Sequence, residues 1–190
     1  MKTVLKTFAA ALLLGVAAMG VAKADPVKIG VAAEPYPPFT SPDASGKWVG
    51  WEIDFIDAVI TPVAWDGIIP ALTTKKIDLI VSSMSITAER AKTIDFSDKY
   101  YNTPTAIIGP KDQKFGSAPD DLKGKIVGVQ VSTVHAVYAK KHFGSTASEI
   151  KEYQTQDEAN NDLAAGRLDA VQADSIALGE FLKSDQGKAC

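Results

Sequence analysis

Short apolar runs rich in β-branched residues alternate with helix-patterned segments from Val27 onward, and this alternation constrains the fold more than any other feature. It is typical of α/β architectures with mainly parallel sheets, because crossover helices join successive parallel strands. The sequence predicts strands at Val27–Ala32, Asp78–Ser82, Thr105–Ile108, Ile126–Gln130, Ile150–Tyr153 and Asp169–Ala173. It predicts helices at Glu52–Ile60, Gly67–Thr74, Thr133–Phe143 and Asp157–Ala165, the last ending at Gly166 as a C-cap.

A weak internal repeat indicates two lobes of the same kind. The segments Lys76–Ser83 and Arg167–Asp174 each begin with a basic residue, an apolar residue and an aspartate, and each continues as a mostly apolar strand with a polar end. Short α/β strands resemble one another by chance, but both copies end in groups that can bind a ligand. Since open α/β sheets bind ligands at the carboxyl ends of their strands, two such edges facing each other would form a cleft.

The amino terminus is typical of a cleaved secretion signal. Lys2 and Lys6 make a basic start, Phe8 to Val21 is an almost wholly apolar run, and Ala22–Ala24 is a small-x-small cleavage site. The run is short for a spanning helix, and no cysteine follows the cleavage point to carry a lipid anchor. We therefore expect a soluble periplasmic protein of a two-membrane bacterium, without direct membrane insertion.

Charge and cysteine content narrow the function classes. Residues 1–24 hold three lysines and no acid, so the mature chain has 17 basic and 23 acidic residues, a net charge of −6. This balance argues against a general role in nucleic-acid binding. Cys190 is the only cysteine, so no disulfide can form within the chain, and a thiol at a chain end lacks the neighbours of a nucleophile.

Hydroxyl groups and a guanidinium follow the predicted strand Asp78–Ser82. Ser83 and Ser85 lie in the turn after it, Thr87 is a plausible N-cap, and Arg90 comes three residues later on a short helix. A helix start offers unpaired backbone N–H groups, and a guanidinium can grip a carboxylate with two parallel hydrogen bonds. This segment therefore predicts an anion site.

The second lobe offers further donors and the opposite charge. Residues Gln130 to His135 again connect a strand to a helix start, and Asp174 ends the strand Asp169–Ala173. An α-amino acid needs both charges held a few ångströms apart. Because the two sites would come from different lobes, the ligand itself would bridge and close them.

Each of these groups also has a purely structural explanation. The serines can satisfy backbone groups of a turn, Arg90 can be a surface residue of its helix, and Asp174 can cap the helix that starts near Ser175. Taken together, they favour a specific ligand site.

Six segments carry a resemblance to one protein family. They are IGVAAEPYPPF (29–39), GKWVGWEIDFIDAV (46–59), WDGIIPAL (65–72), KIDLIVSSMSITAERAKTIDFSDKYY (76–101), DLKGKIVGVQVSTVHAVYAKKHF (121–143) and AAGRLDAVQADS (164–175). The chain resembles the periplasmic solute-binding proteins of polar amino-acid ABC transporters (family 3), which include the histidine, lysine-arginine-ornithine and glutamine receptors. The resemblance implies a periplasmic-binding-protein type II fold, with two doubly wound α/β lobes joined by a hinge. We place the signal peptide at 1–24, lobe 1 at 25–109 and lobe 2 at 110–190.

The resemblance also implies roles for residues at matching positions. Arg90 would bind the ligand α-carboxylate, helped by backbone N–H groups near Ser85 and Val134, and Asp174 would bind the α-ammonium. The further implied contacts are Tyr36, Trp65, Ser82, Ser83, Ser85, Thr133, Val134 and His135. Glu34 lies close to the place where family members carry an acid that meets the ligand side chain, which favours a polar or basic amino acid or an opine-like derivative. We expect no metal and no cofactor, since His135 and His142 alone make a poor metal pair.

This chain lacks two segments that members of the family carry. Family members carry additional residues near positions 60 and 61, where Ile60 here joins Thr61 directly, and they continue beyond the position of Cys190 through a second hinge strand. We therefore expect a fragment or deletion variant whose first lobe is incomplete and whose stability is impaired.

The resemblance implies a receptor that captures an amino acid and delivers it to an ABC permease in the inner membrane. Two alternatives remain open. One is a periplasmic enzyme of the cyclohexadienyl or arogenate dehydratase kind on the same fold, because fold alone does not decide function. The other is a ligand-sensing module of a larger receptor. We favour the receptor, a protein that is not an enzyme, since Arg90 with Asp174 fits amino-acid capture.

Overall fold

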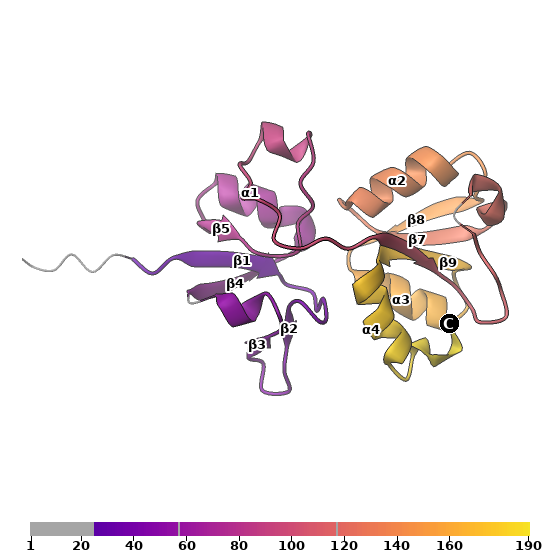
Figure 1. Cartoon of the computed structure of the whole chain (residues 1–190), viewed down its shortest axis with the longest axis horizontal. Coiled ribbons are helices and arrows are strands. Elements are labelled where there is room, and N and C mark those ends of the chain that lie inside the picture. The colour runs from indigo at the N-terminus through magenta and orange to yellow at the C-terminus, as the bar shows by residue number, and fades with distance from the viewer. Residues whose placement is uncertain (1–24, 57, 117) are drawn as a thin grey trace, which may run out of the picture.

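The computed structural model describes residues 25–56, 58–116 and 118–190, so the predicted signal peptide lies outside the described residues. Figure 1 shows two α/β lobes side by side, joined by an extended stretch of chain that leads into β6. The alternation of strands and helices that the sequence predicts is confirmed.

The first lobe is built on a parallel sheet in the order β4-β1-β5. Its strands are β1 (Lys28–Ala32), β4 (Val59–Val63) and β5 (Leu79–Ile80), and α1 (Ile68–Thr73) packs against it. Ile68, Ala71 and Ile77 form the buried cluster between helix and sheet. An antiparallel hairpin of β2 (Ser41–Pro42) and β3 (Trp48–Val49) completes this lobe.

The second lobe has a mixed sheet in the order β6-β9-β7-β8. The strands β7 (Ile126–Gln130), β8 (Glu149–Tyr153) and β9 (Ala170–Asp174) are parallel, whereas β6 (Thr105–Ile108) runs antiparallel to β9. Helix α2 (Val134–Phe143) covers one face of the sheet, and α3 (Gln156–Ala164) and α4 (Ser175–Lys183) lie on the other (Figure 1). The two faces bury separate apolar clusters, one around Phe143 and one around Leu163.

Short 3-10 helices lie at Ile53–Phe55, Trp65–Gly67, Arg90–Lys92, Pro119–Leu122 and Gly187–Ala189. Gly166 has a φ of +71° and follows the last turn of α3, as expected of a C-cap glycine.

The repeat in the sequence corresponds to one hydrogen-bond pattern used twice. Asp78 accepts the Lys28 N–H at 2.8 Å and returns its own N–H to the Lys28 carbonyl at 2.8 Å. Asp169 makes the same exchange with Ile126, at 2.9 Å and 3.0 Å. Each aspartate therefore ties the start of its strand to the start of the central strand of its lobe.

The repeat also supplies one apolar side chain that packs against a glycine of the central strand in each lobe. A Cβ on Gly30 would lie 2.3 Å from Ile77, and a Cβ on Gly128 would lie 2.4 Å from Leu168. Ile77 and Leu168 occupy equivalent positions, directly before the paired aspartates. The two lobes thus share a design in which a glycine leaves room for one buried apolar side chain.

The predicted helix at Glu52–Ile60 is wrong. The described part of this range holds only the 3-10 turn Ile53–Phe55, after which Ile56 is extended and β4 begins at Val59. β4 is rich in β-branched residues and pairs in register with β1, from Lys28 opposite Val59 to Ala32 opposite Val63. Strand pairing with β1 thus outweighs the helical spacing of apolar residues in this segment.

Two boundaries differ from those predicted. In place of the predicted strand Asp78–Ser82, β5 spans only Leu79–Ile80. The second boundary is the one between the lobes, because β6 pairs with β9 in the second sheet. The predicted division between lobes at 109/110 would leave β6 with lobe 1, whereas sheet pairing groups it with the residues that follow. The division itself stays a prediction.

Candidate functional site

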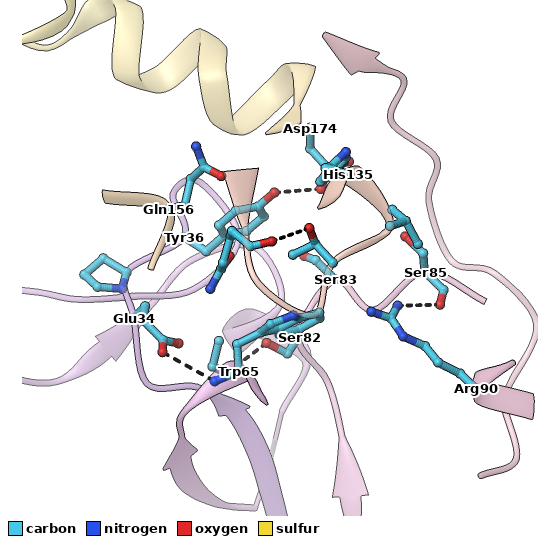
Figure 2. A pocket seen from close by; sticks show the side chains of 15 residues that line it. Glu34, Tyr36, Trp65, Ser82, Ser83, Ser85, Arg90, His135, Gln156 and Asp174 are labelled. Atoms are coloured by element: carbon cyan, nitrogen blue, oxygen red, sulfur yellow. Dashed lines mark hydrogen bonds and ion pairs between the residues drawn. The ribbon is translucent and has the colours of Figure 1, made fainter. Parts of the chain in front are cut away.

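A pocket is lined by residues from both lobes, at the carboxyl ends of β1, β5, β7 and β9 (Figure 2). All the residues that the sequence singled out line it: Glu34, Tyr36, Trp65, Ser82, Ser83, Ser85, Arg90, Thr133, Val134, His135 and Asp174. Four further residues also line it, none of which the sequence analysis named as a ligand contact, although Gln130 begins the connection that it singled out: Ala32, Pro35, Gln130 and Gln156. Gln130 ends a predicted strand, so the rule that points to strand ends could have found it.

The serine loop after β5 is held by side chains as well as by backbone. Ser82 is buried, and its hydroxyl oxygen accepts the Ala32 N–H at 2.8 Å, which gives it a structural role in tying β1 to the loop. Ser83 has a φ of +52°, a left-handed conformation that is uncommon for a serine. Its N–H and its hydroxyl both donate to the carboxylate of Glu52, at 2.7 Å and 3.1 Å.

Arg90 lies where the two lobes meet. Its N–H donates to the Thr87 hydroxyl oxygen at 3.1 Å, so Thr87 caps the turn as the sequence predicts. The guanidinium donates to the Ser85 carbonyl at 2.9 Å and to the Ser132 carbonyl at 3.0 Å, and its centre lies 5.5 Å from the Trp65 ring centroid. Burial lowers the pKa of Arg90 from its ordinary value. Two of its five N–H donors are used in these bonds, which leaves three for a ligand.

The start of α2 supplies donors from the second lobe. Thr133 is the N-cap: its hydroxyl oxygen accepts the Ala136 N–H at 3.1 Å and its proton goes to the Gln130 carbonyl at 2.7 Å. The hydroxyl is thereby engaged within the protein, and the first residues of the helix, Val134 and His135, line the pocket. The Trp65 indole N–H donates to the Ser132 carbonyl at 3.2 Å, a second bond between the lobes.

Asp174 presents its carboxylate to the pocket. It occupies the N-cap position of α4 but makes no side-chain capping bond, so the capping explanation does not account for it. Tyr36 O–H donates to one carboxylate oxygen at 2.6 Å, and Nε2 of His135 lies 3.6 Å from the other. Burial, and then the charge of Asp174, raise the pKa of Tyr36, so the phenol stays a donor.

Glu34 is the acid at the other side of the pocket. In Figure 2 it lies across the pocket from Arg90 and Asp174. One carboxylate oxygen accepts the Trp65 N–H at a long 3.4 Å, and the other is buried with no hydrogen-bond partner among the described residues. A buried carboxylate oxygen without a partner is costly, and a cationic ligand group would relieve that cost.

Within residues 25–56, 58–116 and 118–190, no group of three or more His, Cys, Asp or Glu side chains could hold a metal ion. In the same ranges, none of the helices has both the length and the apolar character needed to cross a membrane.

Two α/β lobes of one design, with groups of both charges in the pocket that they line, define a two-lobed receptor for a small solute. Residues 27–122 match the family described as bacterial extracellular solute-binding proteins, family 3. The chain belongs to this family, and the resemblance drawn from the sequence is confirmed.

Relatives and solved structures agree with this assignment. The chain is 41% identical to the L-arginine-binding protein of Pseudomonas aeruginosa, over 94% of this chain and 73% of that protein. It is 42% identical to the lysine/arginine/ornithine-binding periplasmic protein of Escherichia coli, over 80% of this chain and 63% of that one. An ancestral arginine-binding protein bound to arginine matches with a TM-score of 0.78 and 35% identity, over 85% of this chain and 76% of that one. The type II periplasmic-binding fold and the receptor class are therefore confirmed, and the chain is shorter than these relatives.

Proposed function

We propose that the protein captures a basic amino acid, with L-arginine as the first candidate, and delivers it to an ABC permease in the inner membrane. The observation that carries this proposal is the buried carboxylate oxygen of Glu34, which lacks a partner among the described residues. The names of the arginine-binding and lysine/arginine/ornithine-binding relatives support the same ligand class.

The amino-acid head group would lie between Arg90 and Asp174. The free N–H donors of the Arg90 guanidinium suit the α-carboxylate, and the Val134 N–H at the start of α2 adds a donor from the second lobe. The α-ammonium would pair with Asp174, whose position is supported by the Tyr36 hydroxyl. Since these groups come from both lobes, a bound ligand would hold the lobes together.

The ligand side chain would extend toward Glu34. A guanidinium or ammonium there would pair with the free carboxylate oxygen, and the rings of Tyr36 and Trp65, which line the same pocket, offer aromatic faces to a cation. A neutral side chain such as that of glutamine would leave the Glu34 charge unpaired. The pocket therefore favours a cationic over a neutral polar side chain.

The test is a calorimetric comparison of the mature chain with Glu34→Gln, using arginine, lysine, ornithine, histidine, glutamine and an arginine-derived opine. We expect the substitution to weaken arginine binding roughly 10- to 100-fold, because a charge-assisted pair is lost, and to change glutamine binding little. Arginine affinity that is equal in the two proteins would overturn the specificity proposal.

Export and permease delivery are proposed from family membership and from the amino-terminal pattern. Mass spectrometry of the protein recovered from the periplasm should give a chain that begins at Asp25. An uncut chain, or one retained in the cytoplasm, would contradict the predicted signal peptide. Transport of labelled arginine in vesicles that carry the permease should depend on added protein.

A dehydratase activity is the second candidate, because one structural neighbour is an ancestral amino acid-binding protein described as a precursor of cyclohexadienyl dehydratase, with a TM-score of 0.76 and 34% identity. That neighbour is itself named as a binding protein, and we propose that the present chain is not an enzyme. Incubation with prephenate or arogenate should give no turnover. Measurable turnover would favour the enzyme.

A further inference from the structure

Glu52 is a fully buried acid that does not line the pocket and yet reaches its edge through Ser83. Gly50, with a φ of +128°, lets the chain turn close against Phe39, where a Cβ would lie 2.3 Å from the Phe39 carbonyl oxygen. The Glu52 N–H then donates to that carbonyl at 3.1 Å. This turn fixes the direction in which the Glu52 side chain leaves the backbone.

Three donors converge on the Glu52 carboxylate. One oxygen accepts the Ser83 N–H at 2.7 Å and the Tyr100 hydroxyl, and the other accepts the Ser83 hydroxyl at 3.1 Å. Burial raises the pKa of Glu52, whereas the bonds from Tyr100 and Ser83 oppose that shift, and every partner is a donor, as an ionised carboxylate requires. Because both bonds from Ser83 go to one side chain, Glu52 holds this serine in its left-handed conformation.

The direction of the Ser83 hydroxyl follows from this bonding. A serine hydroxyl has one proton and two lone pairs, and here the proton points at Glu52. What remains for the pocket is the pair of acceptor positions on the oxygen. Ser83 can therefore accept a hydrogen bond from a ligand, but cannot donate one without breaking its bond to Glu52.

An α-ammonium has three N–H donors that point in different directions, so a carboxylate on one side of it can accept only some of them. One oxygen of Asp174 already accepts the Tyr36 hydroxyl, and the other lies 3.6 Å from His135. An additional acceptor from the first lobe would complete the coordination of the ammonium. Ser83, which lines the same pocket, offers that acceptor.

We propose that Glu52 is a positioning residue for ligand capture: it orients the Ser83 hydroxyl as an acceptor and thereby makes the site select ligands with an α-ammonium group. The inference rests on the proposed function, since it assumes that an amino acid occupies the pocket. Glu52 itself does not touch the ligand.

The substitution Glu52→Gln tests this polarity. A glutamine amide can donate to the Ser83 oxygen, which would release the Ser83 proton toward the pocket and replace an acceptor by a donor. Binding of arginine should then weaken roughly 10-fold or more, while binding of 5-guanidinopentanoic acid, the analogue without the α-amino group, should change much less. The ratio of the two dissociation constants is the readout, because general loosening of the lobe would weaken both ligands alike.

Two matched variants complete the experiment. Tyr100→Phe removes another donor from Glu52 and keeps the bond between the Ser83 hydroxyl and Glu52, so it should keep the ratio of dissociation constants even if it lowers the melting temperature. Ser83→Ala removes the acceptor itself and should reduce the preference for arginine, and adding Glu52→Gln to it should produce no further loss of preference. Should Glu52→Gln fail to fold, Ser83→Ala alone decides, and an undiminished preference for arginine in either variant would overturn the proposal.

Ligand binding by the wild-type protein distinguishes failure of this inference from failure of the proposed function. If the wild-type protein binds another amino acid in place of arginine, the arginine proposal fails, and the same ratio is measured with that amino acid and its des-amino analogue. If the wild-type protein binds no amino acid, both proposals are overturned.

Discussion

Asp174 shows how contacts of one side chain decide between a structural and a ligand-binding role. The sequence allows an N-cap role, but the carboxylate makes no capping bond and is engaged by Tyr36 and faced by His135. Thr133 shows the opposite result, since its hydroxyl donates to the Gln130 carbonyl and accepts the Ala136 N–H as the N-cap of α2. Both residues are of a type that caps helices, and both stand at the N-cap position of one. Only the hydrogen-bond partners of the side chain distinguish the capping role from the ligand-binding role.

At this scale we predict that Arg90→Ala and Asp174→Ala each weaken arginine binding by about 2–5 kcal/mol, because each leaves one ligand charge desolvated and unpaired. Isothermal titration calorimetry measures the loss. As a control, Lys92→Ala removes an exposed cation two residues from Arg90 that pairs with Glu89, and it should bind as the wild type does. Unchanged affinity in either site variant would remove that residue from the site.

Two helices of the second lobe, α2 and α3, begin with side-chain caps that have different roles. Thr133 caps α2 at the pocket, and Thr155 caps α3, where Glu158 completes a capping box. Thr155 does not line the pocket. Comparing variants of Thr133 and Thr155 therefore distinguishes the contribution of a cap to helix stability from its contribution to anion binding.

We predict that Thr133→Ala and Thr155→Ala each lower the free energy of unfolding by about 1 kcal/mol, since each loses an N-cap. Only Thr133→Ala should also weaken ligand binding, because the start of α2 contributes donors to the pocket. Urea denaturation and calorimetry on both variants test the difference. Equal binding losses in the two would show that helix stability alone is responsible.

The whole molecule combines two similar lobes, and the first lobe carries three tyrosines near the pocket: Tyr36 and Tyr101, which are partly buried, and Tyr100, which is 48% exposed. Burial raises the pKa of Tyr101 to about 12, and burial first, then hydrogen bonding to Glu52, raises that of Tyr100. Tyr36 has a raised pKa as well, through burial and Asp174. The folded chain therefore favours neutral phenols more strongly than the unfolded chain does.

This difference predicts a loss of stability in alkali. In the unfolded chain the phenols titrate near pH 10, whereas in the folded chain they hold their protons to higher pH, so the free energy of unfolding falls as pH rises from about 10 toward 12. Thermal unfolding across this range, with tyrosinate absorbance as the titration signal, measures it. Tyr100→Phe should reduce the slope, and an equal slope in wild type and variant would contradict this role for Tyr100.

Local pattern was enough to predict most elements and the polar groups at strand ends, whereas Tyr36, Trp65 and Glu34 entered the predicted site only through the family resemblance. Short-range features carry that information: β-branched runs mark β6 and β7, Gly166 marks the end of α3, and polar groups at strand ends mark the site. The helix expected at Glu52–Ile60 was wrong because its apolar spacing also suits a turn followed by a strand, and only pairing with β1 distinguishes a strand from a helix here.

The sequence by itself determined the α/β class, the repeated lobe and the residue types available for a zwitterion, since these depend on periodicity and on chemistry at strand ends. Only the tertiary structure decided the direction of each polar group. The burial of Glu52, the polarity of the Ser83 hydroxyl and the free oxygen of Glu34 depend on contacts between segments far apart in the chain. Hydrogen-bond partners across such distances leave no mark in local sequence, because the same side chains could form other pairs in another fold.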